Sequence, residues 1–174
     1  MRTTFSRVTL LLGFLGTLLL ASPLAAQPAQ QGFGFKGTIS SGETDLVFLT
    51  GGGVYDLATG FVAAAGGFRC LANVGGRLAG CLAGEGVRWD TVELLESTMF
   101  RCTGTDAVKT AVTSDTTVVL QADFYRAGDG DDESFTAQMI VSETDIAPDI
   151  PGEQNLWIQG VGCGTAIVHF SNQP

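Results

Sequence analysis

The sequence predicts an all-β fold, a single antiparallel β-barrel or β-sandwich of about eight to eleven short strands fastened by disulfides. Glycine is abundant and scattered, with 24 residues, and the segments between glycines are rich in Val, Thr, Phe and Ile, as in short strands joined by tight turns. Several segments alternate apolar and polar residues, which places one face in a core and the other in water. No window longer than about 12 residues keeps a helical period.

The first 26 residues are typical of a secretory signal peptide. Arg2 and Arg7 give a positive start, Val8–Ala21 is apolar, and Ser22–Ala26 ends in small residues that suit cleavage. The apolar run is shorter than the roughly 20 residues that a membrane-spanning helix needs. We therefore expect a secreted or periplasmic protein that is not held in a membrane after cleavage.

One β domain is expected after this segment. Gln27–Gln31 is a polar lead-in that we expect to be disordered. Residues 32–174 then form the domain, because no linker divides them and their number suits a single core. Ile146–Gly152 is expected to be a loop, since its two prolines cannot donate to a strand ladder.

Strands are expected wherever a β-branched or aromatic run lies between turn-forming residues. The alternation is clearest in Phe33 and Phe35, and again in the runs around Leu120 and Met139. The expected strands are Phe33–Ile39, Leu46–Thr50, Gly53–Leu57, Phe61–Ala72, Leu78–Leu82, Val87–Leu95, Thr98–Thr103, Thr116–Tyr125, Phe135–Ser142, Asn155–Gly160 and Ala166–Phe170. A barrel is favoured over a sandwich, because the turns are regularly spaced and closure removes unpaired edges.

Two segments need separate interpretation. Gly51–Gly53 allows a turn with positive φ or a bulge, and Asp56–Gly60 can close the next turn. Trp89–Glu96 contains an Asp-x-x-Glu pattern that resembles a capping box and could begin a short helix. A strand is favoured there, because both neighbouring segments are expected to be strands.

The four cysteines, Cys70, Cys81, Cys102 and Cys163, are an even set with three ways of pairing. Their spacing does not suit zinc, because there is no Cys-x-x-Cys pair and the chain has a single histidine. After export they would form disulfides. We favour Cys70–Cys81, which flank an expected turn, and this leaves Cys102–Cys163 as a long-range link.

Charge excludes two classes of partner. The whole chain has a net charge of −9, and without the signal peptide seven basic residues face 18 acidic ones. Nucleic acid binding demands Lys and Arg, and docking on anionic lipid needs the same residues. We therefore expect neither nucleic acid nor a membrane surface as a partner.

An acidic run offers the one candidate metal site. Asp129, Asp131, Asp132 and Glu133 lie in a glycine-containing segment, and Ca²⁺ takes several carboxylate oxygens as ligands. The full spacing of an EF-hand is absent. An Asp-Gly hairpin turn between two strands is the favoured interpretation and a weak calcium site is the alternative. No other cofactor is expected.

The sequence favours a non-enzymatic protein over an enzyme. His169, the only histidine, lies in an alternating strand, and no Gly-x-Ser-x-Gly elbow presents a serine to it. Cys163, set among glycines, is explained by a disulfide without a nucleophilic role.

The segment Leu49–Gly60 (LTGGGVYDLATG) carries a resemblance. It resembles the Gly-Gly-x-Gly-x-[Tyr/Phe]-x-x-Ala-x-Gly hairpin of dirigent and allene-oxide-cyclase-like barrels. It is also similar to a Gly-Gly-Gly-x-[Tyr/Phe]-Asp-x-Ala-Thr-Gly turn in uncharacterised secreted bacterial all-β proteins, which Trp89–Phe170 resembles as well. The first resemblance implies a small antiparallel barrel and transfers no catalytic residue. The second brings no known activity.

Three functions follow as hypotheses. The first is a secreted, non-enzymatic structural or binding module of unknown ligand. The second is a barrel that binds or transforms a small apolar ligand, as the cyclase-like resemblance implies. The third is a calcium-dependent carbohydrate-binding or adhesion module that would use Asp129–Glu133. A small apolar ligand or a glycan is thus the expected partner, and the oligomeric state is left open.

Overall fold

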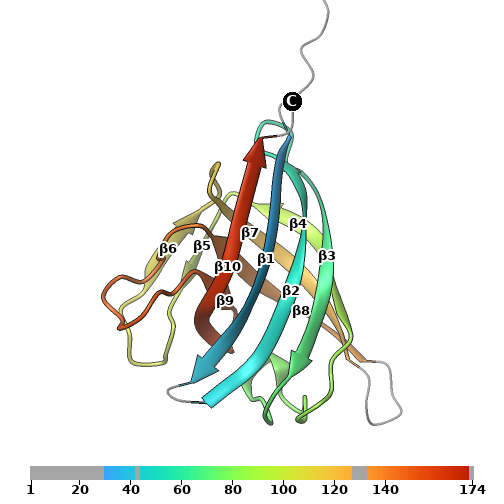
Figure 1. Ribbon diagram of the computed structural model, residues 1–174, viewed down its shortest axis with the longest axis vertical. Coiled ribbons are helices and arrows are strands. Elements are labelled where there is room, and N and C mark those ends of the chain that lie inside the picture. The colour runs from blue at the N-terminus through green and yellow to red at the C-terminus, as the bar shows by residue number, and fades with distance from the viewer. Residues whose placement is uncertain (1–29, 42–43, 127–132, 173–174) are drawn as a thin grey trace, which may run out of the picture.

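Eight strands close into an antiparallel barrel in the computed structural model, which describes residues 30–41, 44–126 and 133–172. Each barrel strand pairs with the next barrel strand along the chain, and the last lies beside the first (Figure 1). The barrel strands are β1 (Gln31–Ser41), β2 (Thr44–Asp56), β3 (Phe61–Cys70), β4 (Arg88–Leu95), β7 (Thr117–Arg126), β8 (Glu133–Ser142), β9 (Leu156–Ile158) and β10 (Gly162–Asn172). The all-β fold and the closed barrel are therefore confirmed.

Two elements lie outside this ring. The strands β5 (Ser97–Phe100) and β6 (Lys109–Val112) form a separate two-stranded sheet between β4 and β7, at the left of the barrel in Figure 1. A short 3-10 helix, η1 (Gly76–Leu78), lies between β3 and β4. Among the described residues, no helix is long and apolar enough to cross a membrane.

The closure of the barrel depends on β1 and β10. Nine consecutive pairs join them, from Gln31↔Asn172 to Ile39↔Gly164. Gln31 thus already belongs to β1, although the sequence places it in the polar lead-in; residues 27–29 lie outside the described part. Pairing the two end strands leaves no long free edge at either end of the sheet, which is the reason for expecting a barrel.

Aromatic side chains fill the interior of the barrel. Phe68 meets Phe124 edge-on at 5.4 Å between ring centroids, and Phe124 stacks on Phe135 at the same distance. Trp89 is fully buried and lies 5.9 Å from the ring of Phe35. The interior is thus packed by side chains of the barrel's own strands, as the alternating sequence pattern requires.

A second apolar cluster covers one outer wall of the barrel. Val119 and Ile140 are cross-strand neighbours on β7 and β8, and both are fully buried although they lie on the outer face. Phe100 and Ala111 from the β5–β6 sheet and Trp157 from β9 belong to the same cluster. The small sheet is therefore packed onto the barrel as a cover.

The prediction of a turn or bulge at Gly51–Gly53 is wrong. These residues continue β2 without interruption and pair with β1 on one side and β3 on the other. Their role is close approach: a Cβ on Gly51 would collide with the indole of Trp89 and would lie 2.7 Å from the carbonyl oxygen of Ala65. The expected turn after β2 is confirmed, because Gly60 has φ of 72° and its N–H donates to the carbonyl of Asp56 at 2.9 Å.

Some of the other local predictions are confirmed and others are wrong. Trp89–Glu96 is a strand as favoured, with a bulge at Val92 where the register to β7 shifts. Leu78–Leu82 is not a strand, because η1 and a tight turn at Gly80, with φ of 90°, occupy it. The strand β6 was not expected from the sequence. Ile146–Gly152 is a loop between β8 and β9, as its prolines predict.

Replacing Gly51 tests the close approach to Trp89. We expect Gly51→Ala to lower the free energy of unfolding by about 1–3 kcal/mol, because the added methyl overpacks a filled interior. Urea unfolding followed by tryptophan fluorescence measures this. The control is Gly34→Ala, where the nearest atom to a new Cβ is the Gly51 carbonyl oxygen at 3.9 Å, so that stability should stay equal or rise by up to about 1 kcal/mol. Equal losses in both variants would contradict the account.

Candidate functional site

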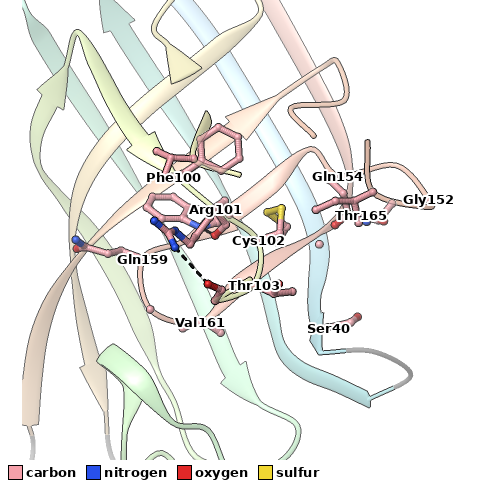
Figure 2. Close-up of a pocket in the computed structure, with 18 of the residues that line it drawn as sticks. Ser40, Phe100, Arg101, Cys102, Thr103, Gly152, Gln154, Gln159, Val161 and Thr165 are labelled. Atoms are coloured by element: carbon pink, nitrogen blue, oxygen red, sulfur yellow. Dashed lines mark hydrogen bonds between the residues drawn. A yellow bond between two sulfur atoms is a disulfide. The ribbon is translucent and has the colours of Figure 1, made fainter. Parts of the chain in front are cut away.

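A groove of about 1120 Å³ lies outside the barrel, beside the β5–β6 sheet. One wall is the chain that leaves β5, residues 99–104 with Val108. The opposite wall is Ile150–Gly152 and Gln154 after β8, and the floor is Trp157 of β9 with Gln159–Thr165, the turn and the start of β10. The chain after β5 thus meets residues 150–165, which lie about 50 positions further along the sequence, at one surface. In Figure 2 Arg101 and Gln159 lie on one side of the Cys102 sulfur, and Gln154 and Thr165 on the other.

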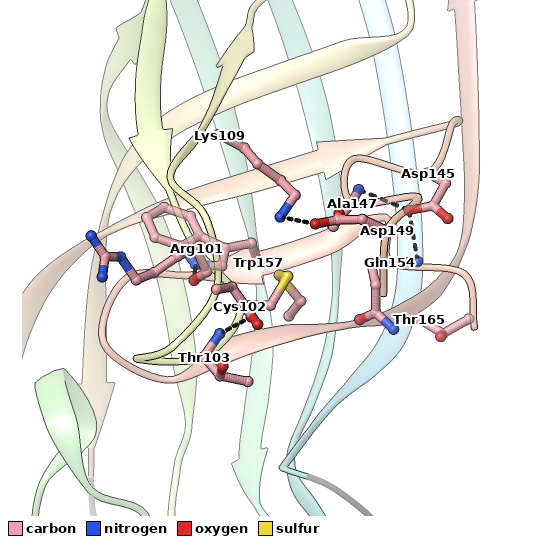
Figure 3. The surroundings of a disulfide bond; sticks show 12 residues. Arg101, Cys102, Thr103, Lys109, Asp145, Ala147, Asp149, Gln154, Trp157 and Thr165 are labelled. Atoms are coloured by element: carbon pink, nitrogen blue, oxygen red, sulfur yellow. Dashed lines mark hydrogen bonds and ion pairs between the residues drawn. A yellow bond between two sulfur atoms is a disulfide. The ribbon is translucent and has the colours of Figure 1, made fainter. Parts of the chain in front are cut away.

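A disulfide joins a wall of this groove to its floor. Cys102 and Cys163 are bonded with their Cα atoms 4.7 Å apart and with a sequence separation of 61. The second disulfide, Cys70–Cys81, spans 11 positions and closes the loop that contains η1. Both pairings are those favoured from the sequence, and the long-range one lies in the candidate site (Figure 3).

Trp157 strengthens the same junction. Its indole N–H donates to the carbonyl oxygen of Arg101 at 3.0 Å, and its ring lies 5.7 Å from that of Phe100. Only 4% of the residue is exposed, so the indole supports the floor from below. The chain after β5 is therefore held by a disulfide, a hydrogen bond and an aromatic contact in succession.

An ion pair fixes the proline loop to β6. The Lys109 ammonium lies 3.0 Å from a carboxylate oxygen of Asp149, and the Lys109 side chain is mostly buried (Figure 3). The hydrogen bond from Lys109 lowers the pKa of Asp149 below its ordinary value. Within the loop, Asp145 accepts hydrogen bonds from the N–H groups of Ala147 at 2.8 Å and Gln154 at 3.3 Å. The carboxylates of this loop thus serve its conformation.

The charge of the groove differs from that of the chain. Its lining residues include no Asp or Glu, although the sequence has 18 of them. Arg101 is the one charged side chain among them. One of its N–H groups donates to the carbonyl oxygen of Gly104 at 3.2 Å, which leaves further guanidinium donors for a ligand. The remaining polar groups, from Thr103, Gln154, Gln159 and others, are neutral.

Of the residues predicted as a calcium site, only Glu133 belongs to the described part of the chain. Asp129, Asp131 and Asp132 lie outside the described residues, and Glu133 is the first residue of β8. Among residues 30–41, 44–126 and 133–172, no group of three or more His, Cys, Asp or Glu side chains is arranged to hold a metal. The strands on either side of the acidic run are antiparallel neighbours, paired as far as Arg126↔Glu133.

Two other titratable residues, His169 and Tyr55, lie outside the groove lining. His169 is exposed on the outer face of β10, as is its neighbour Ile167. The hydroxyl of the buried Tyr55 donates to the carbonyl oxygen of Ser114 at 2.5 Å. Burial raises the pKa of Tyr55, and the negative charges of Asp115 and Glu143 raise it further, so the phenol is a neutral donor.

The sequence analysis did not predict the groove. The sequence does contain one sign that another element covers the outer wall of the barrel beside it. Val118–Leu120 and Met139–Val141 are continuous apolar runs inside otherwise alternating strands. Such runs are typical of strands buried on both faces. They indicate that something must cover the outer wall at Val119 and Ile140, although they do not identify the β5–β6 sheet as the cover.

The two disulfides should differ in their effect on stability. In the chain-entropy model the loop closed by Cys102–Cys163 is worth roughly 4 kcal/mol and that closed by Cys70–Cys81 roughly 3 kcal/mol. We therefore expect the double variant Cys102→Ser/Cys163→Ser to lose more free energy of unfolding than Cys70→Ser/Cys81→Ser. Urea denaturation of both variants measures the difference, and the reverse order would contradict a long-range fastening role.

The Lys109–Asp149 pair predicts a pH dependence. Because the pKa of Asp149 is lowered in the folded state, the pair stabilises the fold above about pH 4, the ordinary Asp value, and this contribution disappears as the pH falls through the folded pKa. NMR titration of the Asp149 carboxyl should show the lowered pKa, and Lys109→Met should return it toward the ordinary value. Lys36→Met, which removes an ammonium lying over the ring of Phe48, is the matched control. An unchanged Asp149 titration in Lys109→Met would exclude the pair as the cause.

Comparison with known proteins adds no relative to this description. Protein-family models, curated proteins and solved structures were each compared with the chain, and none matched. The function therefore has to be inferred from the geometry and charge of the groove.

Proposed function

We propose that this protein is a secreted, non-enzymatic binding module whose ligand occupies the groove beside the Cys102–Cys163 disulfide. The observation that carries the proposal is an open groove, free of carboxylates, in a strongly acidic chain. Its volume of about 1120 Å³ is slightly above the roughly 300–1,000 Å³ usual for ligand sites. Two disulfides support an oxidising compartment, in keeping with the signal-like segment before the domain.

The outer groove is a better candidate than the barrel interior. The interior is occupied by the side chains of the barrel itself, including Trp89, Tyr55 and Phe124, which are all fully buried. A ligand there would have to displace several packed aromatic rings. The groove needs no such rearrangement, because its walls are already fixed in place by the Cys102–Cys163 disulfide and the Lys109–Asp149 pair.

The groove favours an amphipathic ligand that is neutral or negatively charged. Arg101 supplies a cation, and no lining carboxylate opposes an anionic group. Met99, which is 73% exposed, and Val108 supply apolar surface at the rim. Methionine is suited to this position, because its flexible side chain adapts to ligands of different shape.

A binding role without catalysis is supported by the same set of residues. Apart from Arg101, the lining offers hydroxyl, amide and backbone groups and the disulfide, whose sulfurs do not titrate. General acid and base catalysis needs a group that exchanges a proton near neutral pH. Arg101 keeps its proton, so its part is electrostatic attraction and hydrogen bonding.

Removing the Arg101 charge tests the proposal. We expect the fluorescent probe anilinonaphthalene sulfonate, which combines an apolar ring system with an anionic group, to bind the folded protein in this groove. Arg101→Gln should weaken binding about three- to fivefold, since an exposed charge contributes up to about 1 kcal/mol. The Trp157 hydrogen bond should survive, because it uses the Arg101 backbone. Fluorescence titration measures the dissociation constant, and added salt should reduce the difference.

The chain offers a matched control in its second Phe-Arg-Cys sequence. Arg69 is exposed on β3 and is followed by the other disulfide, as Arg101 is. Arg69→Gln removes the same charge away from the groove and should leave probe binding unchanged. Equal weakening in both variants would show attraction to net charge alone, and binding unaffected by Arg101→Gln would refute the groove as the site.

A further inference from the structure

The barrel is joined unevenly around its circumference. Ten residue pairs connect β2 to β3, and ten connect β7 to β8. Only three pairs, Ala65↔Asp90, Gly66↔Trp89 and Gly67↔Arg88, connect β3 to β4. No ladder pair joins Phe61–Ala64 to Thr91–Leu95, and these two facing segments are here named the β3–β4 seam.

A side chain ends the ladder at the seam. The Thr91 hydroxyl accepts a hydrogen bond from the N–H of Ala64 and donates one to its carbonyl oxygen, both at 3.1 Å. It thereby replaces the backbone of β4 at the position where the next ladder pair would form. The bulge at Val92 follows immediately. Bulges bend a strand and increase its twist, so β4 turns away from β3 beyond this point.

Beyond the hydrogen bonds between Thr91 and Ala64, the edge of β3 has no ladder partner on β4. In an antiparallel strand, alternate residues direct their N–H and C=O groups to the same edge. Since Ala64 directs both groups to the β4 side, Val62 does so as well. Val62 is beyond the ladder, so its backbone groups are directed at the seam, where a further strand could pair with them.

Side chains around the seam define what could pair there. A cleft of about 440 Å³ lies at its end, lined by the turn Leu57–Gly60, by Leu94–Glu96 and by Val112 with Thr113. Large apolar side chains on these elements are exposed, and they are Leu57, Phe61, Val92 and Val112. The strand edge and the apolar surface thus lie side by side.

The charge at the seam is opposite to that of the groove. Glu93 and Glu96 are both exposed, and no Lys or Arg occurs among residues 57–64, 91–96 and 112–113. The guanidinium of Arg88, at the end of the ladder away from the seam, already lies 3.4 Å from Asp90, which is at the end next to the seam. A positively charged partner would therefore meet uncompensated carboxylates.

We propose that the β3–β4 seam binds an extended peptide segment with alternating basic and apolar residues, which adds to the edge of β3 as a strand. Backbone hydrogen bonds to Val62 supply the register. Alternate peptide residues point to opposite faces, so its apolar side chains pack on the inner face against Val62 and Leu94, and its basic side chains lie on the outer surface near Glu93 and Glu96. A second copy of this chain fits poorly, because a symmetric edge-to-edge contact would bring these carboxylates together in a chain of net charge −9. The site is independent of the groove beside Cys102–Cys163.

The test uses a labelled octapeptide of alternating Lys and Val, blocked at both ends, and the full domain with its disulfides. Fluorescence anisotropy should show saturable binding that weakens with salt. The same peptide with every backbone nitrogen methylated keeps its charge and side chains but has no backbone hydrogen-bond donor, and it should bind at least about tenfold more weakly. A Glu–Val octapeptide should not bind. Equal binding of the methylated peptide would overturn strand addition.

Protein variants locate the site without threatening the fold. Glu93→Gln/Glu96→Gln should weaken binding of the Lys–Val peptide about fivefold or more. Asp106→Asn/Glu85→Gln is the matched control, because it also removes two carboxylates and keeps an oxygen for the N–H groups of Thr103 and Leu82. This control should leave binding unchanged. Equal weakening in both variants would overturn the assignment to the seam.

Hydrogen exchange gives an independent readout. Peptide binding should slow exchange of the Val62 amide, and residues 99–104 of the groove should be unaffected. Protection of the groove instead of residues 61–64 would overturn the proposal. A concentration-dependent dimer that protects Val62 without peptide would overturn it in favour of a second copy, and absence of binding at millimolar peptide would overturn it altogether.

Discussion

The packing of Trp89 against glycine backbone is the constraint on which the rest of the barrel depends. Its indole is fully buried inside the ring of strands, and its N–H donates to the carbonyl oxygen of Thr50 at 3.1 Å. A side chain on Gly51 or Gly66 would occupy the same space. Glycine in a strand interior is usually unfavourable because of its backbone entropy. Here it allows β2 and β3 to approach the largest side chain of the core. The short ladder between β3 and β4 is centred on Gly66↔Trp89, so one contact both fills the interior and sets where those strands pair.

A filled interior places the candidate sites on the outside. The groove is lined without carboxylates and presents Arg101, whereas the seam presents Glu93 and Glu96. These surfaces differ also in the chemistry they offer. The groove offers neutral polar groups and flexible apolar side chains, which suit a ligand of irregular shape. The seam offers a strand edge, which suits a backbone. Opposite charge would keep a ligand of one site from competing for the other, because the wrong ligand meets repulsion or an unpaired group.

Much of the fold follows from local sequence pattern, and the exceptions have a shared physical cause. Alternation located most barrel strands, and the turn between Cys70 and Cys81 indicated their pairing correctly. Three consecutive glycines indicated a turn, because their conformational freedom is visible in the sequence and their steric role is not. That role depends on Trp89, 38 positions beyond Gly51. The groove was missed for the same reason, since its walls come from separate segments and only tertiary contacts such as Cys102–Cys163 assemble them.

The fastening of the groove is independent of the ladder that closes the barrel. The β5–β6 sheet, which carries one wall of the groove, is the only sheet outside the barrel in the described residues. Three links connect this sheet and the chain that follows β5 to other segments. They are the Cys102–Cys163 disulfide, the bond from Trp157 to the Arg101 carbonyl, and the Lys109–Asp149 pair. None of these links contributes to the pairing of β1 with β10. Loss of one of them would therefore widen the distribution of groove shapes before it opened the barrel. Preorganisation of this kind reduces the entropy lost on binding, so the links would affect affinity even where no ligand touches them.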